Sequence, residues 1–195
     1  MTAQPKRAQA RAWASTWGLL LAALMVAAVL GRYLPSLSTS ADRPFVHTAS
    51  IGQDVPLRTL TVRVNKVSTA TSITDGFSTL TTNDVFLIVS VTFTPTTRTT
   101  LPMGVELHAP DGTIFGGRQV VSSTCRASQP GLPQSCLLPF EVPPDAAPGL
   151  RLWLPSEPFA DPAGDDVASI DLGITDLDAL TAAPPGVTLP PARFP

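Results

Sequence analysis

Residues Asp84–Thr94, with the sequence DVFLIVSVTFT, carry the clearest strand pattern in the chain. Because successive side chains of a strand point to opposite faces, five apolar residues at alternate positions share one face: Val85, Leu87, Val89, Val91 and Phe93. Phe86 and Ile88 begin the other face, which becomes polar at Ser90 and Thr92. A strand that is apolar on one face and on half of the other is typical of the centre of a sheet. The stretch therefore predicts a β fold built around this strand.

Shorter segments on both sides show the same two-residue alternation. In Leu57–Val67, the apolar residues Leu60, Val62 and Val64 alternate with polar ones. Further strands are predicted at Val105–Ala109, Thr113–Phe115, Leu137–Val142, Leu150–Leu154 and Ala168–Ile174, and a short first strand at Phe45–His47. The polar segment Ser68–Thr82, with a turn signal at Asp75-Gly76, is interpreted as a mobile loop. About seven short strands with turns between them predict an antiparallel β-sandwich of immunoglobulin type.

Composition excludes several other classes of protein. The chain has 195 residues, of which 21 are proline and only 14% are charged, and this disfavours a helical bundle. Its net charge is −2, and no cluster of Lys and Arg lies beyond residue 44. Nucleic-acid binding depends on such clusters, so no nucleic-acid partner is expected.

A long apolar stretch precedes the predicted strands. Trp13–Gly31 (WASTWGLLLAALMVAAVLG) contains no charged residue. As a helix, such a stretch reaches about 28 Å, close to the roughly 30 Å of a bilayer's hydrocarbon core. The preceding segment contains Lys6, Arg7 and Arg11 and no acid, and positive charge remains on the cytoplasmic side. We therefore predict a single-pass protein of the cell membrane, with its N-terminus in the cytoplasm and its C-terminal domain outside.

A cleaved secretory signal is the alternative interpretation of this segment. The densest apolar run, Leu19–Leu30, has the length of a signal's apolar region, and small residues occur at Thr39-Ser40-Ala41. Both interpretations place the rest of the chain outside the cytoplasm.

The predicted organisation has five parts. They are a cytoplasmic basic head (residues 1–12), a transmembrane helix (13–33), a tether (34–49), the immunoglobulin-like sandwich (50–176) and a proline-rich tail (177–195) that is extended or disordered.

The order of the motifs resembles a known family. IGQDV, LTVRV, DVFLIVSVTFTP, a PDG hairpin, LPFEVPPD, LRLWL and IDLG follow one another between Ile51 and Gly173. This order resembles a widespread bacterial family of extracytoplasmic immunoglobulin-like domains of unknown function, similar in fold to a secreted mycobacterial immunoprotective antigen. The family's strand and late-loop motifs correspond here to Phe86–Val91 and Phe140–Pro143. The resemblance implies a sandwich behind one membrane span or a lipoprotein signal, and it transfers no catalytic residue.

The two cysteines, Cys125 and Cys136, are a departure from that family pattern. Outside the cytoplasm two cysteines usually form a disulfide, so we predict a bond that closes the loop between them. Two isolated cysteines do not make a zinc site, because zinc takes four ligands.

The histidines and an acidic segment are the remaining candidates for chemistry. His47 and His108 are the only histidines, and both are expected to be surface residues, with His108 facing outward beside Glu106. The segment DPAGDD, with Asp161, Asp165 and Asp166, is expected to be a solvated acidic loop; calcium binding is the alternative. We therefore predict no catalytic residue, metal or cofactor.

Trp153 is the candidate contact residue. It alternates with Leu152 and Leu154, so the pattern turns its ring to the outer face of the sheet. There it either packs under the proline-rich tail or serves as a binding anchor.

These observations favour a membrane-anchored, extracytoplasmic binding or accessory module without catalytic activity, in contact with another envelope protein or an extracellular ligand. The alternatives are a secreted antigen-like protein, a hydrolase that uses His47 or His108, and a structural spacer. Oligomeric state is left open.

Overall fold

The computed structural model describes residues 22–28, 44–74, 78–116, 123–157, 166–176 and 186–188. The chain forms two compact units, Met1–Arg43 and Pro44–Pro195. The described part of the first unit is a short exposed helix over 22–28. No helix of the described residues is long and apolar enough to cross a membrane. Most of the predicted span and tether lies outside the described residues, so the membrane span remains a prediction.

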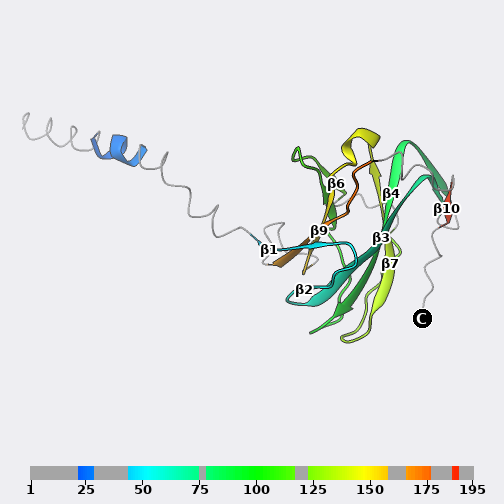
Figure 1. Cartoon of the computed structure of the whole chain (residues 1–195). Coiled ribbons are helices and arrows are strands. Elements are labelled where there is room, and N and C mark those ends of the chain that lie inside the picture. The colour runs from blue at the N-terminus through cyan, green and yellow to red at the C-terminus, as the bar shows by residue number, and fades with distance from the viewer. Residues whose placement is uncertain are drawn as a thin grey trace, which may run out of the picture. The chain divides into compact units, whose positions relative to one another are not determined.

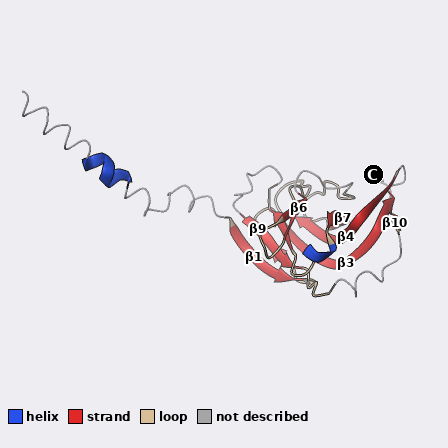
Figure 2. Cartoon of the chain, turned by 90° about the horizontal axis from the view of Figure 1, so that it is seen from above, coloured by secondary structure: helices blue, strands red, loops and turns tan. Residues whose placement is uncertain are grey.

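The second unit is a β-sandwich of two sheets, which confirms the predicted sandwich (Figures 1 and 2). In order across the first sheet lie β1 (Phe45–Ser50), β9 (Asp166–Asp171), β8 (Arg151–Pro155), β5 (Glu106–His108) and β6 (Ile114–Gly116). Across the second lie β10 (Val187–Thr188), β3 (Leu60–Thr74), β4 (Thr79–Pro95) and β7 (Gln134–Val142), with β2 (Val55–Pro56) also paired to β3. A short 3-10 helix, η1 (Pro144–Ala146), follows β7.

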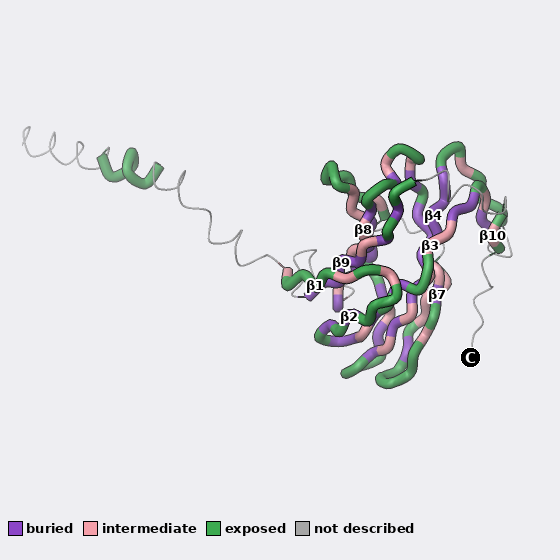
Figure 3. Tube along the Cα trace, in the orientation of Figure 1, coloured by how far each residue is buried: buried purple, intermediate pink, exposed green. Residues whose placement is uncertain are grey.

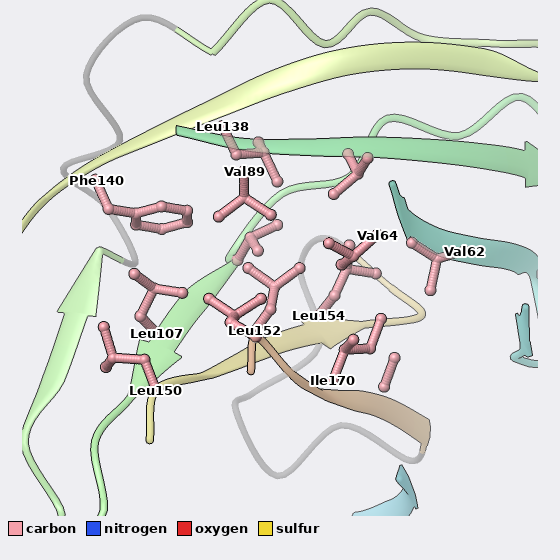
Figure 4. Close-up of a cluster of buried hydrophobic side chains, with 14 of the residues drawn as sticks. Val62, Val64, Val89, Leu107, Leu138, Phe140, Leu150, Leu152, Leu154 and Ile170 are labelled. Carbon is pink, nitrogen blue, oxygen red and sulfur yellow. The ribbon is translucent and has the colours of Figure 1, made fainter. Parts of the chain in front are cut away.

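The main core lies between the two sheets. On β4, Leu87, Val89, Val91 and Phe93 have no exposed surface, as the alternation predicts. From the first sheet, Leu107, Leu152 and Ile170 are equally buried and belong to the same cluster. Figure 4 shows labelled side chains from both sheets directed toward one another. Full burial of each such side chain contributes about 1.5–3 kcal/mol.

The sandwich is mixed, whereas a purely antiparallel one was predicted. β1 pairs in parallel with β9, in a register from Phe45 opposite Asp166 to Ser50 opposite Asp171. β10 pairs in parallel with β3. Parallel neighbours need a long connection, and almost the whole domain lies between β1 and β9. Alternation within a strand carries no information about such a distant partner.

The interpretation of Ser68–Thr82 as a mobile loop was wrong. β3 continues to Thr74 and β4 begins at Thr79, so the segment forms the end of a long hairpin with two register shifts. Ala70 and Ile73 from this segment are buried with Phe86 and Ile88 in a second small apolar cluster. Threonine is β-branched and fits a strand well, so a Thr-rich segment with a few buried residues extends the sheet.

The limits of the predicted domain also shift. All of β1 except Ser50 lies in the predicted tether, so the sandwich begins before residue 50. Val187 and Thr188 of the predicted tail form β10 beside Ile73 and Thr74. The rest of the tail lies outside the described residues, apart from Gly186.

The predicted disulfide is present between Cys125 and Cys136. It lies at β7, the last strand of the second sheet. Beside it, the Thr124 amide donates to the Leu137 carbonyl at 3.1 Å, and the Leu137 amide donates to the Thr124 hydroxyl at 2.8 Å. The bond therefore holds a segment that covers the free edge of β7 at Leu137.

We expect the double variant Cys125→Ser, Cys136→Ser to lose about 2–3 kcal/mol of unfolding free energy, because the open loop regains conformational freedom in the unfolded chain. Urea unfolding of the full chain in detergent measures the loss. If the unfolding free energy of the variant is within about 0.5 kcal/mol of that of the unchanged chain, the range of a neutral surface change, other contacts hold the segment beside β7.

Candidate functional site

Polar and aromatic side chains gather on the outer face of the first sheet. Leu107, Leu152 and Ile170 face the core, so their neighbours along each strand face outward. Six such residues form one area, the Trp153 surface: Glu106, His108, Arg151, Trp153, Ser169 and Asp171. Pairing sets Glu106, Trp153 and Ser169 in one row across the sheet, and His108, Arg151 and Asp171 in the next.

Trp153 and His108 are stacked at the centre of this surface. Their ring centroids are 4.7 Å apart and their planes differ by 6°. The two residues are diagonal neighbours on adjacent strands, a separation that aromatic side chains bridge. The His108 ring nitrogen Nε2 also lies 2.9 Å from Glu106 Oε2. The outward orientation predicted for both residues is thus confirmed, but both are half-buried because each covers the other.

Arg151 links the two rows of the surface. Its Nε donates to the Ser169 hydroxyl and its Nη2 to the Ser169 carbonyl, each at 2.9 Å. Its Nη1 lies 3.5 Å from Asp171 Oδ2. These contacts fix the position of the guanidinium between Ser169 and Asp171. The stacked rings of Trp153 and His108 therefore lie between the Glu106 carboxylate on one side and the Arg151–Asp171 pair on the other.

Asp166 is buried, in contrast to the solvated loop that was expected. It begins β9 and is 8% exposed. Its Oδ1 lies 2.6 Å from His47 Nε2, and its Oδ2 accepts the Arg58 amide at 2.6 Å. The carboxylate therefore joins β1, β9 and the turn before β3. Asp161 and Asp165 lie outside the described residues, and no group of three potential metal ligands occurs among the residues that are described.

The two histidines are not brought together. His47 lies on β1, at the far side of β9 and β8 from His108 on β5. His47 lies opposite Ala168 of β9, whose side chain faces the core, so His47 is on the core-facing side of the sheet. His108 faces outward. The structure thus offers two separate acid–imidazole pairs.

A hollow of about 530 Å³ lies beside His47. Its lining consists of His47, Thr48 and Ala49 of β1, the segment Gly52–Pro56, and Arg63. At its rim Arg63 makes a two-pronged contact with Asp54, with Nε 2.7 Å from Oδ1. The hydrogen bond from Arg63 lowers the pKa of Asp54, so the pair stays charged down to acidic pH.

Arg151, Ser169 and Asp171 were not among the predicted site residues. The alternation that turns Trp153 outward also turns these three residues outward, because Arg151 is next to Leu152, and Ser169 and Asp171 are on either side of Ile170. What the sequence lacks is the strand order that makes β5, β8 and β9 neighbours.

Comparison with known proteins gives limited similarity. No family model matches the chain. No curated protein matches it either. Among solved structures, an uncharacterized β-sandwich protein from Clostridium difficile is similar with a TM-score of 0.45 and 8% identity, over 67% of this chain and 96% of that one. The yjhA protein from Bacillus subtilis is similar with a TM-score of 0.45 and 14% identity, over 63% of this chain and 99% of that one.

We expect Asp166→Ala to lower the unfolding free energy by about 1–3 kcal/mol, because it leaves the Arg58 amide without its acceptor. His47→Ala is the matched control and should cost less, since the Arg58 contact remains and the histidine side chain is 45% exposed. Denaturant unfolding of both variants tests the difference. An equal loss in the two would mean that the histidine contact, not the backbone contact, is the important one.

Proposed function

We propose that the protein is a membrane-anchored, extracytoplasmic binding or accessory module without catalytic activity, and that the Trp153 surface is where it contacts another envelope protein or an extracellular ligand. The single observation that carries this proposal is the stacked His108–Trp153 pair at the centre of the outer face. Tryptophan and arginine are the residues most enriched at energetically important contacts. Both stand here on strands, where packing and hydrogen bonds fix their orientation before a partner arrives.

The remaining parts of the proposal rest on the sequence and on the disulfide. The uncharged stretch Trp13–Gly31 supports a membrane anchor with the domain outside. The disulfide supports the same location, because such bonds persist in oxidising compartments. The motif order supports membership of the immunoglobulin-like superfamily of extracytoplasmic domains. A secreted form is the alternative, and the mass of the mature chain distinguishes it by the loss of the first 41 residues.

A hydrolase is a second candidate function, and the His47–Asp166 pair is the observation that favours it. A carboxylate 2.6 Å from an imidazole orients it as the aspartate of a catalytic triad orients the general-base histidine. Within the described part of the chain, however, no hydroxyl or thiol group joins this pair. Loss of an activity in the double variant His47→Ala, His108→Ala would support the hydrolase.

We expect Trp153→Ala to weaken partner binding by about thirtyfold, the effect of losing a central aromatic anchor. Chemical crosslinking in native membranes, purification through a C-terminal tag and mass spectrometry identify the partner; titration then gives its affinity. Leu132→Ala is the matched control, because Leu132 is 56% exposed in a turn away from this surface. Recovery of the same partner with unchanged affinity from Trp153→Ala would exclude this surface.

A further inference from the structure

We propose that β1 is a dimerisation edge, and that the protein associates with a second copy of itself by antiparallel pairing of the two β1 strands across a two-fold axis at His47. This goes beyond the binding role of the Trp153 surface, which lies on a different part of the same sheet.

β1 is an open strand edge. It is the first strand of its sheet and pairs only with β9 among the described strands. In a parallel ladder every second residue directs its amide and carbonyl away from its neighbour. On the free side of β1 the Ser50 amide and carbonyl bond to Gln53, and the other outward backbone groups have no partner among the described residues. Five of its six residues are exposed (Figure 3).

Its sequence lacks the usual protection of such an edge. FVHTAS contains no lysine, no acid and no proline, and its pairing with β9 has no bulge. Native proteins normally use those features to prevent edge-to-edge association. Instead, β1 presents Phe45, which is 70% exposed, and Val46, which is 44% exposed.

The edge strands of the second sheet are partly covered by other segments. On the free edge of β7, Leu137 bonds to Thr124, and the disulfide holds this segment in place. β3 pairs with β10 at Ile73 and Thr74 and with β2 at Thr61 and Val62. Of the described edges, β1 therefore combines the greatest exposed apolar surface with an uncovered backbone.

The hollow beside β1 argues for a second copy as the occupant. The core-facing side of β1 carries Phe45, His47 and Ala49, as their register with β9 shows. A two-fold axis at His47 sets each Phe45 opposite Ala49 of the other copy. Ala49 lines the hollow together with Val55 and Pro56, and the polar residues Gln53, Asp54 and Arg63 complete its wall. Each exposed phenyl ring therefore meets the apolar part of a mixed surface, twice in one contact.

The outer face of β1 is equally suited to this register. Val46 falls opposite Thr48 of the other copy, and β-branched side chains pair well across antiparallel strands. The strand contains no lysine, arginine, aspartate or glutamate to repel its copy, and the Arg63–Asp54 pair beside it is neutral as a unit.

Such a dimer has a consequence for binding. The axis is perpendicular to the sheet, so both Trp153 surfaces lie on the same face of one continuous sheet. Five strand spacings of about 4.8 Å separate the two β8 strands, which sets the two surfaces about 24 Å apart. The dimer would therefore engage a repetitive or paired partner bivalently.

Sedimentation equilibrium of the full chain in detergent tests the proposal. We expect a monomer–dimer equilibrium whose dissociation constant rises by about thirtyfold in Phe45→Asp. Ile114→Asp is the matched control, because Ile114 is 56% exposed on β6 at the opposite edge, and it should leave the constant unchanged. Thermal unfolding midpoints of the variants confirm that each is folded.

Oxidative crosslinking tests the register independently. We expect His47→Cys to form a disulfide-linked dimer within the native oxidised chain, and Ile114→Cys to remain monomeric. A monomer at every concentration overturns the proposal. A dimer whose dissociation constant is unchanged in Phe45→Asp also overturns it, because that result is expected of association through the apolar N-terminal stretch. Equal crosslinking of the two cysteine variants overturns it as well.

Discussion

The burial of one face of β4 between two sheets is the contact on which the rest of this domain depends. Leu87, Val89, Val91 and Phe93 are fully buried there. β4 lies between β3 and β7 in its own sheet and supplies the surface on which the other sheet packs. A one-residue slip in its register would turn that apolar row to solvent. The register of β4 therefore fixes the positions of its neighbours, and through the core it fixes which side chains of the first sheet point away from it.

The Trp153 surface is a consequence of the same alternation. Each inward residue of the first sheet has outward neighbours, so Leu152 in the core requires Arg151 and Trp153 outside. Because packing fixes the strands, the outward side chains are held in place and need only local contacts to be ordered. The stack of His108 on Trp153 and the hydrogen bonds of Arg151 to Ser169 supply those contacts. Side chains ordered in this way lose little further conformational entropy when a partner binds.

Local pattern was enough to predict the sandwich, the main strands, the disulfide and the outward position of Trp153. It failed where the outcome depends on distant parts of the chain. The Thr-rich segment before β4 looks like a loop by composition, yet Ala70 and Ile73 are buried by contact with β4. Asp166 looks solvated within DPAGDD, yet it is buried by contacts with His47 and the Arg58 amide, both more than 100 residues away. In each case long-range pairing outweighed local propensity.

The edge strands β7 and β1 differ in whether another segment covers them, and this difference affects how the protein can associate. At the edge of β7, the segment around Thr124 bonds to Leu137 and is held there by the disulfide. β1 has no such cover, although its parallel pairing with β9 and the His47–Asp166 contact hold it firmly in the sheet. A rigid edge with exposed Phe45 and Val46 pays little entropy on pairing, and it gains both hydrogen bonds and apolar burial. An edge of that kind favours addition of a strand, and a two-fold contact satisfies both partners with a single surface.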